Sequence, residues 1–170
     1  MVIEDDCRFQ TQDNWTVIID TILSRLQWSV IFGATVSFNS RGFRYVNSPH
    51  IVGLKPDFVI TGTHCVIYNS QFYSTIIQLI ENEVKSESPY HLDMLLSLNL
   101  HASIYLTVPF VALFTENDRS DVRVGKSTQI DYQNIRDSEQ KAIFFINQIR
   151  NFHASKTIDC ERQNEKALCQ

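Results

Sequence analysis

Long apolar runs are missing from this sequence. The longest unbroken apolar stretches, such as residues 142–146, fall far short of the roughly 20 residues that cross a bilayer. We therefore expect no membrane span. The N-terminus carries Glu4, Asp5 and Asp6 where a secretory signal would place positive charge ahead of an apolar run. This pattern predicts an intracellular protein, in the cytoplasm or the nucleus.

Cysteine pairs and histidine motifs are missing as well. No C-x-x-C pair occurs and no histidine stands at zinc-finger spacing, so neither a structural zinc site nor a disulfide framework is expected. The histidines also lack the H-E-x-x-H spacing of a metal site, and only His50 and His91 are placed where they could reach a cleft. We interpret the four cysteines as free thiols; they are Cys7, Cys65, Cys160 and Cys169.

Glycine is scarce, with five residues in the chain. No G-x-x-x-x-G-K-[ST] or G-x-G-x-x-G loop is present to cradle a nucleotide phosphate. The G-x-S-x-G turn of serine hydrolases is absent too. A net charge of -4 argues against a generic basic coat for nucleic acid, although cations gathered around one groove would suffice for phosphate contacts.

What is present suits one globular domain. The 170 residues are about one domain's worth, and 44% apolar with 20% charged residues is an ordinary globular composition. No repeat, low-complexity block or linker divides the chain. We expect a single domain over residues 1–154 and a flexible polar tail over residues 155–170.

Helix and strand patterns alternate along the first part of the chain. Apolar residues at helical spacing predict a helix over residues 13–26, which Asp13 or Asn14 can cap. β-branched and aromatic residues then predict a strand over residues 30–38, and residues 39–42 supply turn chemistry.

A hairpin is predicted around Gly62. Two short β-prone runs, residues 54–60 and residues 65–68, flank this glycine. Pro56 cannot donate a ladder hydrogen bond, so it should open its strand and leave Asp57 at the strand's mouth, where a carboxylate can face a cleft.

In the second half of the chain the sequence predicts a helix, then a strand, then a second helix. Ser88 and Pro89 predict the start of a helix that runs to about Ser103. The apolar run over residues 110–114 is typical of a strand that is covered on both faces. A last amphipathic helix is expected over residues 138–152, and it should bury Ile143, Phe144, Ile146 and Ile149.

Two segments carry the candidate chemistry: Pro56-Asp57 and Glu81-Asn82-Glu83-Val84-Lys85. A Pro-Asp that opens one strand, followed by an acidic-x-Lys tripeptide, a Leu-rich helix and an apolar strand, resembles the core of the PD-(D/E)xK nuclease superfamily. The resemblance covers about residues 13–117. It implies an α/β fold with a central mixed β-sheet flanked by helices, the restriction-endonuclease-like core.

The resemblance also implies a reaction. Asp57 and Glu83 would hold Mg²⁺ or Mn²⁺, with Glu81 or Asp20 as further metal ligands, and Lys85 would help to place the attacking water. On a strand, Glu83 and Lys85 would project from the same face. The predicted function is a metal-dependent nuclease that hydrolyses phosphodiester bonds of DNA or RNA, the sequence not distinguishing the two.

Nucleic-acid contacts are expected next to this site. The cations Arg41, Arg44 and Lys55 precede or border it, and Phe43 and Tyr45 are interleaved with them. Such a composition suits phosphate contacts together with base stacking. An ordinary solvated loop and edge strand would have the same composition, so this alternative stays open.

A helix over residues 71–86 is the competing interpretation of the second segment. Apolar residues recur there at helical steps, and Glu81 with Lys85 forms an i,i+4 pair. Asn69 and Gln71 would then take the acidic-x-Lys positions across from Asp57, where amides bind metal poorly. This alternative predicts a catalytically inactive module of the same fold that binds nucleic acid or a protein partner. A third possibility is an unrelated fold in which both motifs are accidental.

Overall fold

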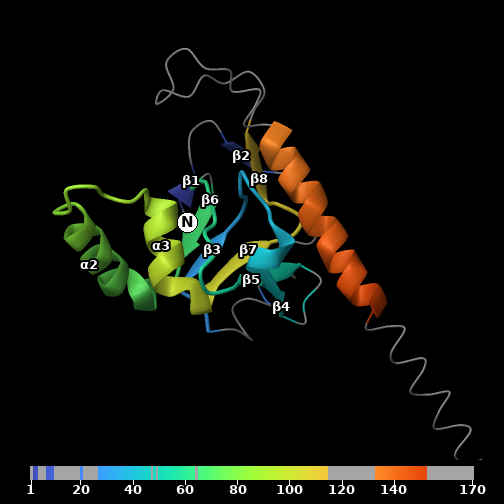
Figure 1. Cartoon of the computed structure of the whole chain (residues 1–170), viewed down its shortest axis with the longest axis horizontal. Coiled ribbons are helices and arrows are strands. Elements are labelled where there is room, and N and C mark those ends of the chain that lie inside the picture. The colour runs from blue at the N-terminus through green and yellow to red at the C-terminus, as the bar shows by residue number, and fades with distance from the viewer. Residues whose placement is uncertain are drawn as a thin grey trace, which may run out of the picture.

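The chain folds as an α/β protein built around one mixed sheet (Figure 1). The computed structural model describes residues 2–3, 7–9, 20, 27–46, 48, 50–63, 65–114 and 133–152. The strand order in the sheet is β1-β6-β3-β7-β5-β4. The strands are β1 (Val2–Ile3), β3 (Val30–Phe32), β4 (Phe43–Tyr45), β5 (Ile51–Leu54), β6 (Cys65–Tyr68) and β7 (Ile104–Thr107). This confirms the predicted α/β class and the mixed sheet.

The parallel pair β3 and β7 forms the centre of the sheet, and every other pairing in it is antiparallel. Every residue of β3, β5 and β7 is buried. Strands covered on both faces need apolar side chains in both directions. The sequences of these three strands are therefore nearly continuous apolar runs. In β3, Val30 and Phe32 join the larger core cluster while Ile31 joins a smaller one on the opposite face.

Among the residues that the structure describes, the helices with defined bounds beside the sheet are α2 (Tyr73–Glu83), α3 (Leu92–Leu100) and a helix over residues 133–152. Figure 1 shows α2 and α3 at one end of the molecule and the helix over residues 133–152 at the other. Buried residues of all three join the larger core cluster, namely Ile76, Leu96, Ile135, Ala142 and Ile146. The described connections include the short 3₁₀ helices η1 (Ser40–Gly42), η2 (Ser70–Phe72) and η3 (His101–Ser103).

The helix over residues 133–152 is fixed by two buried polar side chains. The hydroxyl of Ser138 accepts a hydrogen bond from the Phe38 amide at 3.0 Å and donates one to the Val36 carbonyl at 2.9 Å. The carboxylate of Glu139 accepts from the Phe110 amide at 3.0 Å. The predicted start at Ser138 was therefore wrong: this hydroxyl lies inside the helix and makes a tertiary contact instead of capping it.

The burial predicted for this last helix holds in part. Ile146 is buried and Ile143 and Ile149 are half-buried, but Phe144 is 63% exposed. Ile135 and Ala142 take the buried positions together with Ile146. The prediction failed at Phe144 because it is two residues from both Ala142 and Ile146, about 200° around a helix with 3.6 residues per turn, and so lies on the opposite side.

The predicted hairpin between residues 54–60 and residues 65–68 is wrong. β5 pairs with β4 and β7, whereas β6 pairs with β1 and β3. The residues after β5 form a loop that hydrogen-bonds to α3: the Ile60 amide donates to Ser97 Oγ at 3.0 Å, and the Gly62 amide donates to Asp93 Oδ2 at 2.7 Å. Their backbone donors are therefore satisfied by side chains rather than by a strand ladder.

The central strand β7 was not predicted, because its residues, three apolar ones and Thr107, follow the predicted helix over residues 88–103 without a break. α3 starts at Leu92 rather than Ser88, and η3 then leads directly into β7. The apolar run over residues 110–114 forms only the strand β8 (Ala112–Phe114), which pairs with β2 (Cys7–Phe9) in a separate two-stranded sheet. The strand predicted over residues 30–38 is likewise confined to β3.

Several predictions fall on parts of the chain that the structure does not describe. The predicted helix over residues 13–26 lies outside the described residues except for Asp20, which is helical and exposed. The tail over residues 155–170 lies outside them as well. Within the described ranges, no helix is long and apolar enough to cross a membrane.

Candidate functional site

Asp57 lies in a turn that directly follows β5. Its side chain is exposed, and its backbone has a φ of 65°, in the left-handed region. Aspartate tolerates this region better than most residues because its short polar side chain can bond locally. Pro56 is part of the same turn, so the Pro-Asp pair ends a strand instead of opening one.

Glu81 and Glu83 lie at the C-terminal end of α2, and Lys85 follows in the next turn. The prediction that this segment is a strand is wrong, and the alternative of a helix over residues 71–86 is confirmed for residues 73–83. Glu83 is the last residue of α2, and its carboxylate accepts a hydrogen bond from the Tyr90 amide at 2.6 Å. Glu81 and Lys85 are exposed. The carboxylate of Glu83 therefore holds the loop that leads from α2 towards α3.

Asp57 lies after β5, whereas Glu83 and Lys85 lie at and just beyond the end of α2. Among the residues that the structure describes, no group of three or more His, Cys, Asp or Glu side chains is placed to hold a metal ion. Mg²⁺ would need several oxygen ligands around one point. The metal roles of Asp57, Glu81, Glu83 and Asp20 therefore stay predictions.

Asn69, one of the two amides that could have replaced the charged residues of the acidic-x-Lys tripeptide, has structural partners. The side chain of Asn69 donates to the Trp28 carbonyl at 2.8 Å and accepts from the Gln71 amide at 3.1 Å, which opens η2. Since β6 does not pair with β5, these residues do not form the hairpin partner of Asp57.

The predicted nucleic-acid contacts are divided by the fold. Arg44 donates to the carbonyls of Leu54 at 3.3 Å and Ala102 at 3.0 Å, and its guanidinium lies 5.6 Å from the centre of the Tyr105 ring. Arg44 thus connects the edge strand β4 to η3. Arg41 is exposed and Lys55 is half-buried. The nucleic-acid contacts of Arg41, Arg44 and Lys55 remain predictions.

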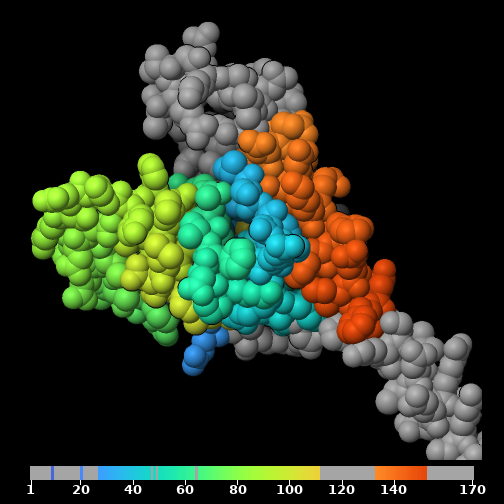
Figure 2. Space-filling model, in the orientation of Figure 1, coloured from blue at the N-terminus to red at the C-terminus, as the bar shows by residue number. Residues whose placement is uncertain are grey.

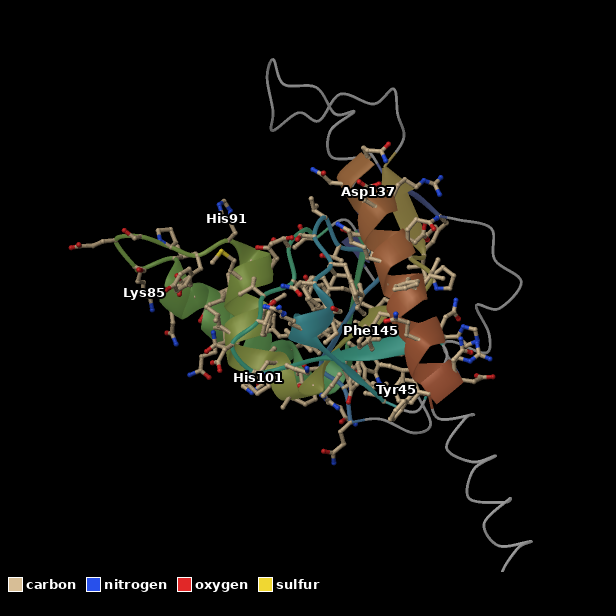
Figure 3. All side chains as sticks on the ribbon, turned by 45° about the vertical axis from the view of Figure 1, so that its right-hand side comes forward. Tyr45, Lys85, His91, His101, Asp137 and Phe145 are labelled. Carbon is tan, nitrogen blue, oxygen red and sulfur yellow. The ribbon has the colours of Figure 1, made fainter. Side chains whose placement is uncertain are left out.

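Figure 3 places the two predicted regions at different ends of the molecule. Tyr45 lies near the helix over residues 133–152, whereas Lys85 and His91 lie at the opposite outer edge. His91 occupies the N-cap position of α3 without a side-chain capping bond, and His50 has a buried Nδ1 without a partner. The basic and aromatic segment and the acidic-x-Lys segment therefore do not line one cleft.

Sequence reasoning missed an exposed apolar stripe on α2. We call Tyr73, Ile77, Ile80 and Val84 the α2 stripe; their exposed fractions are 49%, 54%, 36% and 74%. Along the helix these residues follow one another at steps of four, three and four, so they share one side. The neighbouring side, with buried Ile76, faces the core. The sequence could have predicted the stripe, because apolar residues occupy more of the circumference of this helix than α3 alone can cover.

The charges near the α2 stripe are unevenly distributed. The N-terminal part of the segment, residues 70–80, has no charged side chain. Beyond it stand three carboxylates, Glu81, Glu83 and Glu87, against the single ammonium group of Lys85. Figure 2 shows that α2 and α3 form a lobe at the edge of the molecule. The stripe is therefore apolar along its length and bordered by negative charge at one end.

β6 carries a buried thiol and a half-buried phenol whose ionisation is suppressed. Burial raises the pKa of the Cys65 thiol to about 11, and it also raises the pKa of the Tyr68 phenol. Cys65 is a free thiol, as predicted. A buried thiol that stays protonated is a weak nucleophile, so Cys65 serves packing rather than chemistry.

The comparisons with known proteins leave the family open. The chain matches no family model, no curated protein and no solved structure. What the structure shares with the predicted resemblance is the α/β class with a mixed sheet and helices. Membership of the PD-(D/E)xK superfamily stays a prediction.

Proposed function

We propose that this chain is a catalytically inactive, PD-(D/E)xK-like α/β module that binds a protein partner through the α2 stripe. The observation that carries the proposal is the exposure of Tyr73, Ile77, Ile80 and Val84 along one side of α2. Scattered exposed apolar residues are normal on any protein, but a contiguous row of them is typical of an interaction surface.

The energetics of this surface favour a partner. Burying apolar surface contributes about 25 cal/mol per Å², or about 1.5–3 kcal/mol for each large aliphatic side chain that becomes fully covered. Three aliphatic residues and one tyrosine of the α2 stripe lie in a row, and tyrosine is enriched at interfaces because it combines an apolar ring with a polar hydroxyl. A partner that covers the row gains from all four side chains at once.

The positions of the candidate catalytic residues support a metal-dependent nuclease less well. Its reaction needs Asp57, Glu83 and Lys85 around one Mg²⁺ or Mn²⁺ ion and one phosphate. In this chain Asp57 follows β5, whereas the Glu83 carboxylate accepts from the Tyr90 amide at the end of α2. The C-terminal end of α2 lies next to the α2 stripe. It does not lie on a strand beside Asp57, as the nuclease motif would require.

The proposal is tested by site-specific photo-crosslinking in the source cell. The crosslinking amino acid p-benzoylphenylalanine is placed at Ile77 in the α2 stripe or, as the matched control, at the exposed Thr75 on the other side of the same helix. We expect one discrete protein adduct from position 77 that excess unmodified chain competes away, and none from position 75. Equal labelling from both positions, or no adduct from position 77, would contradict the proposal.

The absence of nuclease activity is tested separately. Purified chain is incubated with single- and double-stranded DNA and RNA in Mg²⁺ or Mn²⁺, beside Asp57→Ala, Glu83→Ala and an EDTA control. We expect no cleavage above that of the variants. Metal-dependent cleavage that both substitutions abolish would establish a nuclease and overturn the inactive assignment.

A further inference from the structure

We infer that the partner presents an amphipathic helix with lysine or arginine residues at one end, laid along the α2 stripe with its cations at the Val84 end. This inference rests on the proposed function and specifies the partner's chemistry. It is carried by two observations, the geometry of the stripe and the distribution of charge beside it.

The geometry of the stripe suits a helix. From Tyr73 to Val84 the helical rise of 1.5 Å per residue gives a length of about 16 Å, or about three turns of a helix lying alongside. Steps of four, three and four residues are the spacing with which one helix presents a straight row to another. An extended strand would need unpaired backbone groups at a sheet edge, whereas α2 uses its own backbone groups internally.

The charges beside the stripe predict the sign of the charge on the partner and the direction in which the partner lies along α2. Glu81 and Glu87 are exposed and Glu83 is half-buried at the C-terminal end, where the helix dipole adds partial negative charge. Only Lys85 opposes them in this segment. Cations on the partner would meet these carboxylates, while its uncharged end would meet residues 70–80, which carry no charge.

A second copy of the chain fits this charge distribution less well. Two parallel α2 helices would bring their carboxylates together, and two antiparallel helices would place Glu81 and Glu87 against the uncharged N-terminal half of the other copy. Neither arrangement supplies cations to the acidic end beyond Lys85. An anionic bilayer surface would be repelled by the same carboxylates.

The inference is tested with synthetic helical peptides and the full chain. The probe is an 18-residue amphipathic peptide with leucine at steps of four, three and four and three lysines at one end; its matched peptide carries three glutamates instead. Fluorescence anisotropy measures both. We expect the lysine peptide to bind at least ~10-fold more tightly, and this preference to shrink as salt screens the carboxylates.

Three variants of the chain locate the binding. Ile77→Gln should weaken the lysine peptide at least ~10-fold, the cost of one large side chain at the centre of an interface, while Thr75→Gln leaves it unchanged. The double variant Glu81→Lys with Glu87→Lys should reverse the preference in favour of the glutamate peptide. Circular dichroism checks that each variant is folded. Equal affinity for both peptides, or binding that ignores Ile77→Gln, overturns the inference.

Failure of this inference is distinguishable from failure of the proposed function. If neither peptide binds while crosslinking from position 77 persists, the partner is a protein of another shape and only the helix assignment is lost. If the chain dimerises in sedimentation and Ile77→Gln abolishes the dimer, the occupant is a second copy and the inference is overturned. Binding to vesicles containing phosphatidylserine that Ile77→Gln abolishes overturns it in favour of a lipid surface.

Discussion

Gly33 shows at the scale of one residue how closely the core is packed. A Cβ atom at this position would collide with the side chains of Val111 and Cys65. We expect Gly33→Ala to lower the free energy of unfolding by about 1–3 kcal/mol, because overpacking a filled core forces side chains from their preferred rotamers. Denaturant unfolding measures the loss. The exposed control Ser70→Ala should stay within about 0.5 kcal/mol, and an unchanged midpoint for Gly33→Ala would contradict this account of the packing.

Cys65 gives stability a dependence on alkaline pH. Burial raises the pKa of its thiol from 9.0 to about 11 in the folded chain. Below pH 9 the thiol is protonated in both states, but above pH 9 only the unfolded chain releases the proton, so stability falls as the pH rises towards 11. We expect the free energy of unfolding to fall less steeply between these pH values in Cys65→Ala than in the unsubstituted chain. Identical slopes in urea titrations at pH 8, 9, 10 and 11 would exclude this contribution.

The helix over residues 133–152 depends, at the scale of one element, on the hydroxyl of Ser138. Ser138→Ala removes its two hydrogen bonds and leaves the buried Phe38 amide without that acceptor. We expect a loss of about 1–3 kcal/mol, the typical cost of a buried unsatisfied group. The exposed neighbour Asp137, labelled in Figure 3, bonds only within the helix to Gln133, so Asp137→Ala is the matched control and should cost little. Equal losses in the two variants, read from thermal unfolding, would argue against the buried contact.

α2 presents two apolar sides with different roles. Ile76 is 6% exposed and packs in the larger core cluster, whereas its neighbour Ile77 is 54% exposed. We expect Ile76→Gln to destabilise the chain by several kcal/mol, about 2–5 for the loss of a large core side chain, and Ile77→Gln to stay within about 0.5 kcal/mol. Chemical denaturation of both variants measures the difference. A large loss in Ile77→Gln would mean that the chain itself covers the α2 stripe.

The whole sheet predicts an order of backbone protection. β3 and β7 have a neighbouring strand on each side, whereas β4 is an edge strand and α2 lies at the end of the molecule. Amides buried in a sheet's centre exchange only on global unfolding, while edges open locally. We expect the slowest hydrogen exchange at Ile31 and Tyr105 and faster exchange in α2. Exchange from α2 that is as slow as from β7 would contradict this order.

Local patterns predicted the elements of this fold better than its pairings. The predicted helix that contains Ile76, Ile77 and Ile80 was correct, and the amphipathic pattern around Ile146 was correct in part, because helical periodicity is a property of neighbouring residues. Strand partners depend on residues far apart in the chain, so the pairing of β5 with β7 could not be inferred from Gly62. The same holds for the site: a helix was the correct alternative for Glu81 and Glu83, whereas Lys85 follows α2 in a turn, and the exposure of Ile77 depended on how α2 meets the core.

The central pairing of β3 with β7 has a consequence for how the chain is made. Ser29 and Ser103, whose hydroxyls lie 2.7 Å apart at the base of this pair, are separated by 74 residues of sequence. At a synthesis rate of about 5–20 residues per second, β3 must wait roughly 4–15 s on the ribosome before its parallel neighbour is translated. During that interval the apolar Val30, Ile31 and Phe32 have only β6 to pair with from the described strands. Chaperone contact with the nascent chain should therefore end only after Thr107 has left the ribosomal tunnel.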